Sequence, residues 1–312
     1  MIMIYYLKRI ISAIFTLFII ATLTFFMMRA IPGGPFTRER TLDPVIEARL
    51  LAQYNLDAPL MEQYFDYMND LIHFDLGPSF QYKGYTVNDF IRVGFPISAK
   101  IGAIATLAII IVGIPIGIIS ALKQNKPIDY TVMVLATLGV TIPSFIIATL
   151  YIYIFGYKLN WVPAGGMGDS PLYYIGPVIA LSGYSLSFVA RLTRSSMLEV
   201  IQQDYIRTAR ANGLSEFKVM GKHALKNGLI PVVTYIGPMI AAILTGSFVV
   251  EYVFGIAGIG ERFVTSVTAR DYTTVVGVTV FYAAFYIVMV LLVDIAYSFI
   301  DPRIKMGKKS GD

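Results

Sequence analysis

The sequence has no cysteine and few charged residues. None of its 312 residues is cysteine, and only 14% are Asp, Glu, Lys or Arg. The lack of cysteine excludes disulfide bonds, thiolate metal sites and cysteine nucleophiles. The two histidines, His73 and His223, are isolated in sequence and favour surface or structural roles over a metal cluster. With 56% hydrophobic residues, the chain is too apolar and too poor in charge for a soluble fold of this length.

Long uncharged runs account for most of the apolar residues. A bilayer core about 30 Å thick requires about 20 residues of helix, because each residue rises about 1.5 Å and backbone polar groups must be satisfied internally. Six runs meet this requirement, at residues 10–28, 101–122, 130–157, 170–190, 227–250 and 272–293. The sequence therefore predicts an all-α, polytopic membrane protein with six transmembrane helices and both termini on one side.

Basic residues cluster in the loops on the side of the termini. They are Lys8, Arg9, Lys123, Lys126, Arg191, Arg194, Arg207, Arg210, Lys218, Lys222, Lys226, Arg303, Lys305, Lys308 and Lys309. Because short positively charged loops stay in the cytoplasm, we expect both termini to be cytoplasmic, in the inner membrane of a prokaryote. The net charge of +5 then reflects orientation in the lipid bilayer, and no nucleic acid is expected as a partner.

The N-terminal third divides into a short tail, one span and a long loop. Residues 1–9 are predicted to be cytoplasmic. The apolar run that follows resembles a signal peptide in its basic start, but it continues through Phe25 and Met28 without a small-residue cleavage pattern. We therefore expect residues 10–30 to remain as the first transmembrane helix. Residues 31–99 form a loop long enough to be translocated regardless of its charge, and we expect it to be extracytoplasmic.

The loop at residues 31–99 carries its own helical pattern. Its apolar and aromatic residues recur at helical spacing, with Asp57 as a candidate cap ahead of Pro59. They are Leu60, Tyr64, Tyr67, Met68, Leu71 and Ile72. The pattern predicts a small amphipathic helical cap, which either docks a partner or covers the bundle.

The segment at residues 193–228 is the longest basic loop. Asp204 is placed to cap a short helix over residues 205–212, and Gly213 suits a left-handed helix end. Ser215 is placed to cap a second helix over residues 216–227. The sequence thus predicts a helix, a tight glycine turn and a helix, either as a solvated element at the membrane surface or as a docking site.

Glycine and proline interrupt several spans. Gly113 and Gly117 stand at the spacing of small residues that lets membrane helices approach closely, and Pro143 lies inside the third run. Such residues fit either ordinary close packing or a bundle whose helices rock against one another.

Read with its surroundings, the basic loop resembles the inner-membrane permease family of binding-protein-dependent ATP-binding-cassette importers. Residues 204–213, Asp-Tyr-Ile-Arg-Thr-Ala-Arg-Ala-Asn-Gly, occupy the place of the family's Glu-Ala-Ala-x-x-x-Gly signature. More narrowly, the chain is similar to the B subunits of oligopeptide permeases. Further stretches that carry the likeness are residues 25–29, 32–35, 77–80, 121–125, 129–133, 142–145, 223–226, 230–231 and 301–302.

Two positions depart from the family pattern. Arg207 and Thr208 stand where the broad signature has Glu and Ala, so a contact specific to glutamate is not expected. Ala257 replaces a proline of similar proteins in an outer turn.

The resemblance implies a type I ATP-binding-cassette importer permease fold, with a permease core at residues 100–312 and a cytoplasmic coupling loop at 193–228. It implies that the short helix docks in a cleft of an ATPase subunit and that Gly213 sets its exit angle. The implied coupling residues are Asp204, Tyr205, Arg207, Thr208, Ala209, Arg210, Gly213 and Leu214.

The implied function is that of half the channel of an ATP-driven oligopeptide importer. Its partners would be a second homologous permease, two ATPase subunits, an extracytoplasmic peptide-binding protein and the peptide. The chain has no G-x-x-x-x-G-K-[ST] phosphate loop. It is therefore expected to be a transport subunit without cofactors of its own, while ATP and Mg bind the partner ATPases. A dipeptide or nickel importer of the same family is the nearest alternative.

Two other classes of protein were weighed. An intramembrane hydrolase would need a nucleophile and a base, and the sequence shows no motif that supplies them. A secondary transporter driven by an ion gradient would need an acid within the membrane. Asp294 is the candidate, although its place near the inner end of the last span favours a packing role. Glu251 and Asp271 lie at predicted outer ends.

Overall fold

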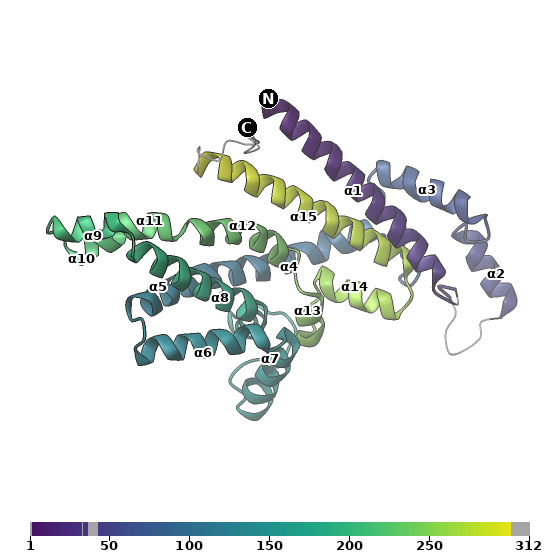
Figure 1. The fold of residues 1–312 in the computed structure, drawn as a ribbon. Coiled ribbons are helices and arrows are strands. Elements are labelled where there is room, and N and C mark those ends of the chain that lie inside the picture. The colour runs from purple at the N-terminus through teal and green to yellow at the C-terminus, as the bar shows by residue number, and fades with distance from the viewer. Residues whose placement is uncertain (1, 33, 37–42, 301–312) are drawn as a thin grey trace. The chain divides into compact units, whose positions relative to one another are not determined.

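The computed structural model describes the backbone of residues 2–32, 34–36 and 43–300, and the side chains of residues 7–32, 34–36, 43–293 and 295. Helices make up nearly all of these residues (Figure 1). Within the described ranges no β-strand occurs, and an isolated antiparallel bridge pairs Pro78 with Thr86. The predicted all-α class is therefore confirmed.

The chain forms two compact units. The first comprises residues 1–97, 257–288 and 298–312, and the second comprises residues 98–256 and 289–297. The sequence places a boundary at 99/100, close to the change of unit at 97/98. The structure additionally groups residues 257–288 with the N-terminal unit, a long-range association that local patterns do not reveal.

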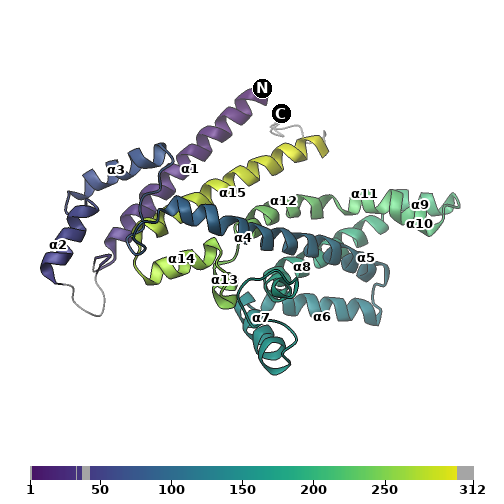
Figure 2. The ribbon, with the colours of Figure 1, turned by 180° about the vertical axis from the view of Figure 1, so that it is seen from behind.

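The first unit is built on two long helices. It contains α1 (Ile2–Ala30), α2 (Pro44–Gln53), α3 (Leu60–Ile72), the start of α4 (Val87–Ala108), α14 (Ile259–Thr268) and most of α15 (Tyr272–Ile300). Helix α3 lies beside α1 in both views (Figures 1 and 2). The hydroxyls of Thr22 and Tyr64 share a hydrogen bond of 2.8 Å, and the rings of Phe25 and Tyr64 lie 5.4 Å apart.

The helical structure observed in the loop at residues 31–99 differs from the prediction in two details. The amphipathic helix is confirmed as α3, but Asp57 does not cap it, because the helix begins at Leu60 after Pro59 without a side-chain cap. Helix α2 was not predicted. Its N-terminus is capped by Asp43, whose carboxylate accepts a hydrogen bond of 2.8 Å from the Val45 amide.

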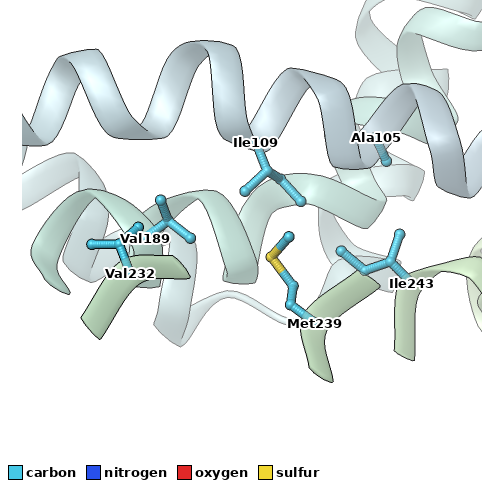
Figure 3. Packing of buried hydrophobic residues seen from close by; sticks show 6 residues of the cluster. All are labelled: Ala105, Ile109, Val189, Val232, Met239 and Ile243. Carbon is cyan, nitrogen blue, oxygen red and sulfur yellow. The ribbon is translucent and has the colours of Figure 1, made fainter. Parts of the chain in front are cut away.

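The second unit surrounds α8 (Leu172–Ile201). Its other elements are the end of α4, η1 (Ile109–Gly113), α5 (Ile114–Leu122), α6 (Pro127–Thr141), α7 (Ser144–Tyr151), η2 (Ile152–Lys158), α9 (Asp204–Ala211), α10 (Glu216–Lys218), η3 (Val219–Ala224), α11 (Leu225–Gly228), α12 (Ile230–Leu244) and α13 (Phe248–Phe254). Its central core consists of Ala105, Ile109, Val189, Val232, Met239 and Ile243. Figure 3 shows Ile109 and Met239 pointing toward one another from facing helices.

Small residues bring α5 close to α8. A Cβ atom on Gly117 would lie 2.6 Å from the Cβ of Thr193, and one on Gly113 would lie 3.1 Å from the Val189 side chain. Since real Cβ atoms do not approach so closely, a larger residue at Gly117 would push the two helices apart. The spacing of Gly113 and Gly117 therefore serves close helix packing in this structure.

Among the residues that the structure describes, four helices are long and apolar enough to cross a membrane, and up to six spans result if each of two bent helix pairs counts as one. The third predicted run is one of these pairs, with a bend of 102° between α6 and the helix formed by α7 and η2. Pro143 causes the break, because it lacks an amide proton and forces Ile142 into an extended conformation (ψ 120°). The other pair bends by 51° between residues 216–228 and α12. The fifth predicted run is interrupted again beyond α12, which ends at Leu244, and Gly246 adopts a positive φ of 83°.

Candidate functional site

The structure confirms the predicted helix, glycine turn and helix at residues 204–228, which we call the 204–228 segment. Residues 193–201 of the predicted loop at 193–228 belong instead to the end of α8. Helix α9 ends before Gly213, whose φ of +77° is left-handed, and α10, η3 and α11 follow. The predicted cap at Asp204 is wrong, because Asp204 is the first residue of α9 and an extended Gln203 holds the N-cap position. Ser215 holds the predicted N-cap position of α10, but its side chain makes no capping hydrogen bond.

One side of the 204–228 segment packs on its own unit. Ile206 and Val219 are fully buried, and Ala209 is 7% exposed. Together with Ala224 they contact Ala121 at the end of α5 and Met197 near the end of α8. The segment therefore sits on a small apolar core of its own at the end of this unit where α5 and α8 finish (Figure 1).

The opposite side of α9 and the glycine turn faces outward. Of the eight coupling residues named from the sequence, seven are exposed: Asp204, Tyr205, Arg207, Thr208, Arg210, Gly213 and Leu214. Ala209 is the exception, since it packs into the core beneath the helix. Of the two neighbouring small residues Thr208 and Ala209, Thr208 alone is exposed, and its hydroxyl donates a hydrogen bond of 3.0 Å to the Asp204 carbonyl.

Polar contacts join α9 to the helices that follow the glycine turn, which we call the second arm of the segment. Arg210 Nε donates to a Glu216 carboxylate oxygen at 2.7 Å, across the glycine turn. The Asn227 side-chain amide donates to the Tyr205 hydroxyl at 2.8 Å. Each bond joins α9 to the second arm, so the turn at Gly213 has a defined geometry.

Phe217 is the feature of this surface that sequence reasoning missed. Its side chain is 88% exposed, whereas Leu214 is 38% exposed and Tyr205 is 41% exposed. A signal was present, because Phe217 is the only Phe, Trp or Tyr between Tyr205 and Tyr235 in an otherwise basic stretch. Exposed aromatic residues of this kind are enriched at the centres of protein interfaces.

A buried ion pair lies next to the apolar core on which the 204–228 segment packs. Asp129, at the start of α6, is 2% exposed and accepts two hydrogen bonds from Arg194 on α8, at 2.6 and 2.7 Å. It also accepts from the Ser120 hydroxyl and from the Asn125 amide at 2.9 Å. Sequence patterns did not pair these two residues, because they lie 65 positions apart.

The other acids singled out from the sequence are engaged in local structure. The buried Asp271 carboxylate accepts from the Ser79 and Thr274 hydroxyls and from the Phe80 amide at 3.0 Å. Glu251 accepts from the Ser98 hydroxyl at 3.0 Å. The side chain of Asp294 lies outside the described residues. Among those described, no three His, Cys, Asp or Glu residues gather to hold a metal ion.

A cavity of about 390 Å³ lies in the first unit, lined by parts of α1, α3 and the start of α15. Arg29 in its wall donates to Gln63 at 2.9 Å, and Asn55 donates to Asp66 at 2.9 Å. Burial raises the pKa of the lining Tyr67 phenol above its ordinary value.

Comparison with known proteins agrees with this fold. A family model described as "Binding-protein-dependent transport system inner membrane component" matches residues 113–306, and a model of the N-terminal part of such membrane components matches residues 2–88. A chain of the MetNI methionine ABC transporter, solved in inward-facing conformations, superposes with a TM-score of 0.52 at 16% identity. The match covers 68% of this chain and 94% of that one.

Two curated relatives are similar over nearly their whole length. The oligopeptide transport system permease protein OppB of Salmonella typhimurium is 47% identical over 300 residues, covering 96% of this chain and 98% of the relative. The dipeptide transport system permease protein DppB of Bacillus subtilis is 47% identical over 305 residues, covering 98% and 99%.

The helical architecture and the spans define a multi-pass membrane protein with the fold of a type I ABC importer permease. The chain belongs to the family of binding-protein-dependent transport system inner membrane components. It is thus an inner-membrane transport subunit.

Proposed function

We propose that this chain is a permease subunit of an ATP-driven oligopeptide importer. It forms half of the translocation channel together with a second homologous permease. Two separate ATPase subunits bind ATP and Mg, and an extracytoplasmic binding protein delivers the peptide. The proposal is supported by two peptide permeases at 47% identity over nearly the full chain. The chain itself binds no cofactor in this scheme.

The 204–228 segment is the proposed site of coupling to the ATPases. The observation that carries this proposal is its two-sided build: Ile206 and Ala209 anchor α9 to its own unit, while Tyr205, Arg207 and Thr208 remain exposed. A partner that binds the exposed face moves the helix ends beneath it, because a packed helix transmits displacement as a rigid element. We add Phe217 to the predicted docking surface.

Orientation follows from the same proposal. The basic residues of the loops support a cytoplasmic location of both termini and of the 204–228 segment, on the side where ATP is available. The loop at residues 31–99 then lies on the opposite side, where the binding protein delivers its cargo.

Peptide uptake into vesicles that carry the complete importer tests the proposed function. Uptake should require ATP on the side of the ATPases and should persist when ionophores collapse every ion gradient. Uptake that follows a gradient without ATP would contradict the proposal and make Asp294 the residue to study.

Dipeptides are the second candidate substrate class, because the dipeptide and oligopeptide permeases are equally identical to this chain. Competition in the same vesicles separates the two classes. Labelled pentapeptide uptake that an excess of dipeptide leaves unchanged supports the oligopeptide assignment, and uptake of the dipeptide alone overturns it.

The glycine turn provides a matched pair of variants. Gly213→Ala places a Cβ on a residue with φ +77°, which costs about 1 kcal/mol in a left-handed conformation. We expect ATP-dependent uptake to fall about fivefold, with normal membrane insertion. Gly221→Ala is the control, because a Cβ there meets no atom within 4 Å and the backbone is not left-handed. Equal uptake by the two variants would count against a fixed turn geometry.

A further inference from the structure

The Asp129 carboxylate joins three elements of the second unit. Arg194 reaches it from α8, Ser120 from α5, and the Asn125 amide from the turn that connects α5 to α6. Asn125 itself has a positive φ of 61°, so the turn is held in a conformation that few residues adopt. Asp129 is the first-turn acid of α6, where the helix dipole favours a negative charge.

This network adjoins the apolar core under α9. Ser120 immediately precedes Ala121, and Arg194 lies three residues before Met197 on the same helix. Ala121 and Met197 both contact the core that contains Ile206 and Ala209 of α9. Gly117 and Thr193, one turn further along α5 and α8, make the close approach described above. The hydrogen-bond network of Asp129 and the apolar core under α9 are therefore adjacent, and the same two helices, α5 and α8, contribute to both.

A buried ion pair is a poor means of gaining stability. Desolvating two charges costs several kcal/mol, and replacing such a pair by packed apolar side chains is often neutral or stabilising. A carboxylate that accepts hydrogen bonds from four donors on three elements instead fixes the relative orientation and spacing of those elements. Apolar contacts define such geometry less strictly.

We propose that Asp129 is a positioning residue for energy coupling, holding the ends of α5, α6 and α8 as one body so that displacement of α9 reaches all three helices. The inference rests on the proposed coupling role of the 204–228 segment. Arg194, Ser120 and the Asn125 amide are its partners in this function.

Three variants separate positioning from plain stability. Asp129→Asn keeps the size of the side chain but removes its charge, and its NH2 group takes the place of one acceptor oxygen, opposite Arg194 and either the Ser120 hydroxyl or the Asn125 amide. The double variant Asp129→Leu/Arg194→Met removes both charges and leaves none unpaired, so it should insert and assemble normally. Ser120→Ala removes one neutral donor and serves as the mild member of the series.

Uptake and ATP hydrolysis are measured together in the complete complex. In both Asp129→Asn and the double variant, peptide uptake per ATP hydrolysed should fall about tenfold, while the amount of assembled complex in the double variant stays at the native level. Native coupling in a fully assembled double variant would overturn the proposal, because the pair would then serve stability alone.

A distance measurement distinguishes failure of this inference from failure of the proposed function. The chain has no cysteine, so spin labels at Gln124→Cys and Lys222→Cys, both exposed, report on the turn and on the 204–228 segment within cysteine-free partners. Asp129→Asn should broaden the distance distribution by electron paramagnetic resonance. An unchanged distribution overturns the positioning role. A broadened distribution with undiminished uptake shows that positioning is lost without consequence and overturns the coupling role of the segment.

Discussion

Each compact unit contains a buried aspartate, and the two carboxylates accept hydrogen bonds from chemically different donors. Asp271 precedes α15 and is satisfied by neutral donors, namely the hydroxyls of Ser79 and Thr274 and the Phe80 amide. Asp129 uses the Arg194 guanidinium in addition to a hydroxyl and an amide.

The difference lies in what remains when the carboxylate is removed. Without Asp271, the side chains and amide left behind are neutral and lose only hydrogen bonds. Without Asp129, the Arg194 side chain, which is 22% exposed, keeps a charge with no partner. Loss of a partner from a buried ion pair costs more than loss of neutral hydrogen bonds. The two residues thus predict a graded series of effects.

Asp129→Ala should have the largest effect. It leaves a mostly buried guanidinium unpaired, and we expect the free energy of unfolding to fall by about 3 kcal/mol. Chemical denaturation of the purified subunit in detergent measures the change. The prediction fails if Asp129→Ala is no more destabilising than Asp129→Leu combined with Arg194→Met.

Asp271→Ala should have an intermediate effect. It removes the acceptor at the N-terminus of α15 and frees the turn at Ser79 and Phe80, at a cost of about 2 kcal/mol. The same denaturation assay applies, with Thr274→Val as a partial variant that removes one of the donors. If Asp271→Ala lowered the free energy of unfolding as much as Asp129→Ala does, the unpaired charge of Arg194 would have no additional destabilising effect.

Glu216→Gln should have the smallest effect on stability. The Glu216 side chain is 65% exposed and its partner Arg210 is 39% exposed, and such surface pairs contribute about 0.5 kcal/mol or less. We expect the denaturation midpoint to stay within error. A change of the size expected for Asp271→Ala would mean that the contact across the glycine turn is coupled to the buried core.

Local patterns in the sequence predicted local structure. Four of the six long apolar runs correspond to unbroken helices long enough to span a membrane. Gly213 predicted a left-handed turn, because glycine has no Cβ that would clash there. The spacing of Tyr64, Tyr67 and Leu71 predicted α3. The cap at Asp204 was wrong by one residue, since Gln203 holds the N-cap position of α9. Ser215 does hold the N-cap position of α10, but its side chain makes no capping hydrogen bond.

Long-range features were beyond the reach of local patterns. Arg194 was interpreted only as an orienting charge, and its pairing with Asp129 depends on how α6 packs against α8. Pro143 predicted an irregularity in the third run but not a bend of 102°. Likewise, the burial of Ala209 depends on where Ala121 and Met197 lie.

The central claim, that the 204–228 segment contacts the ATPases, is tested most directly by photo-crosslinking in the complete complex. A benzoyl-phenylalanine in place of Phe217, which is 88% exposed, is compared with one in place of Phe74, which is 85% exposed in the first unit. The account predicts an adduct with an ATPase subunit from position 217 and none from position 74. An ATPase adduct from position 74, or its absence from position 217 in an importer that still transports, would contradict it.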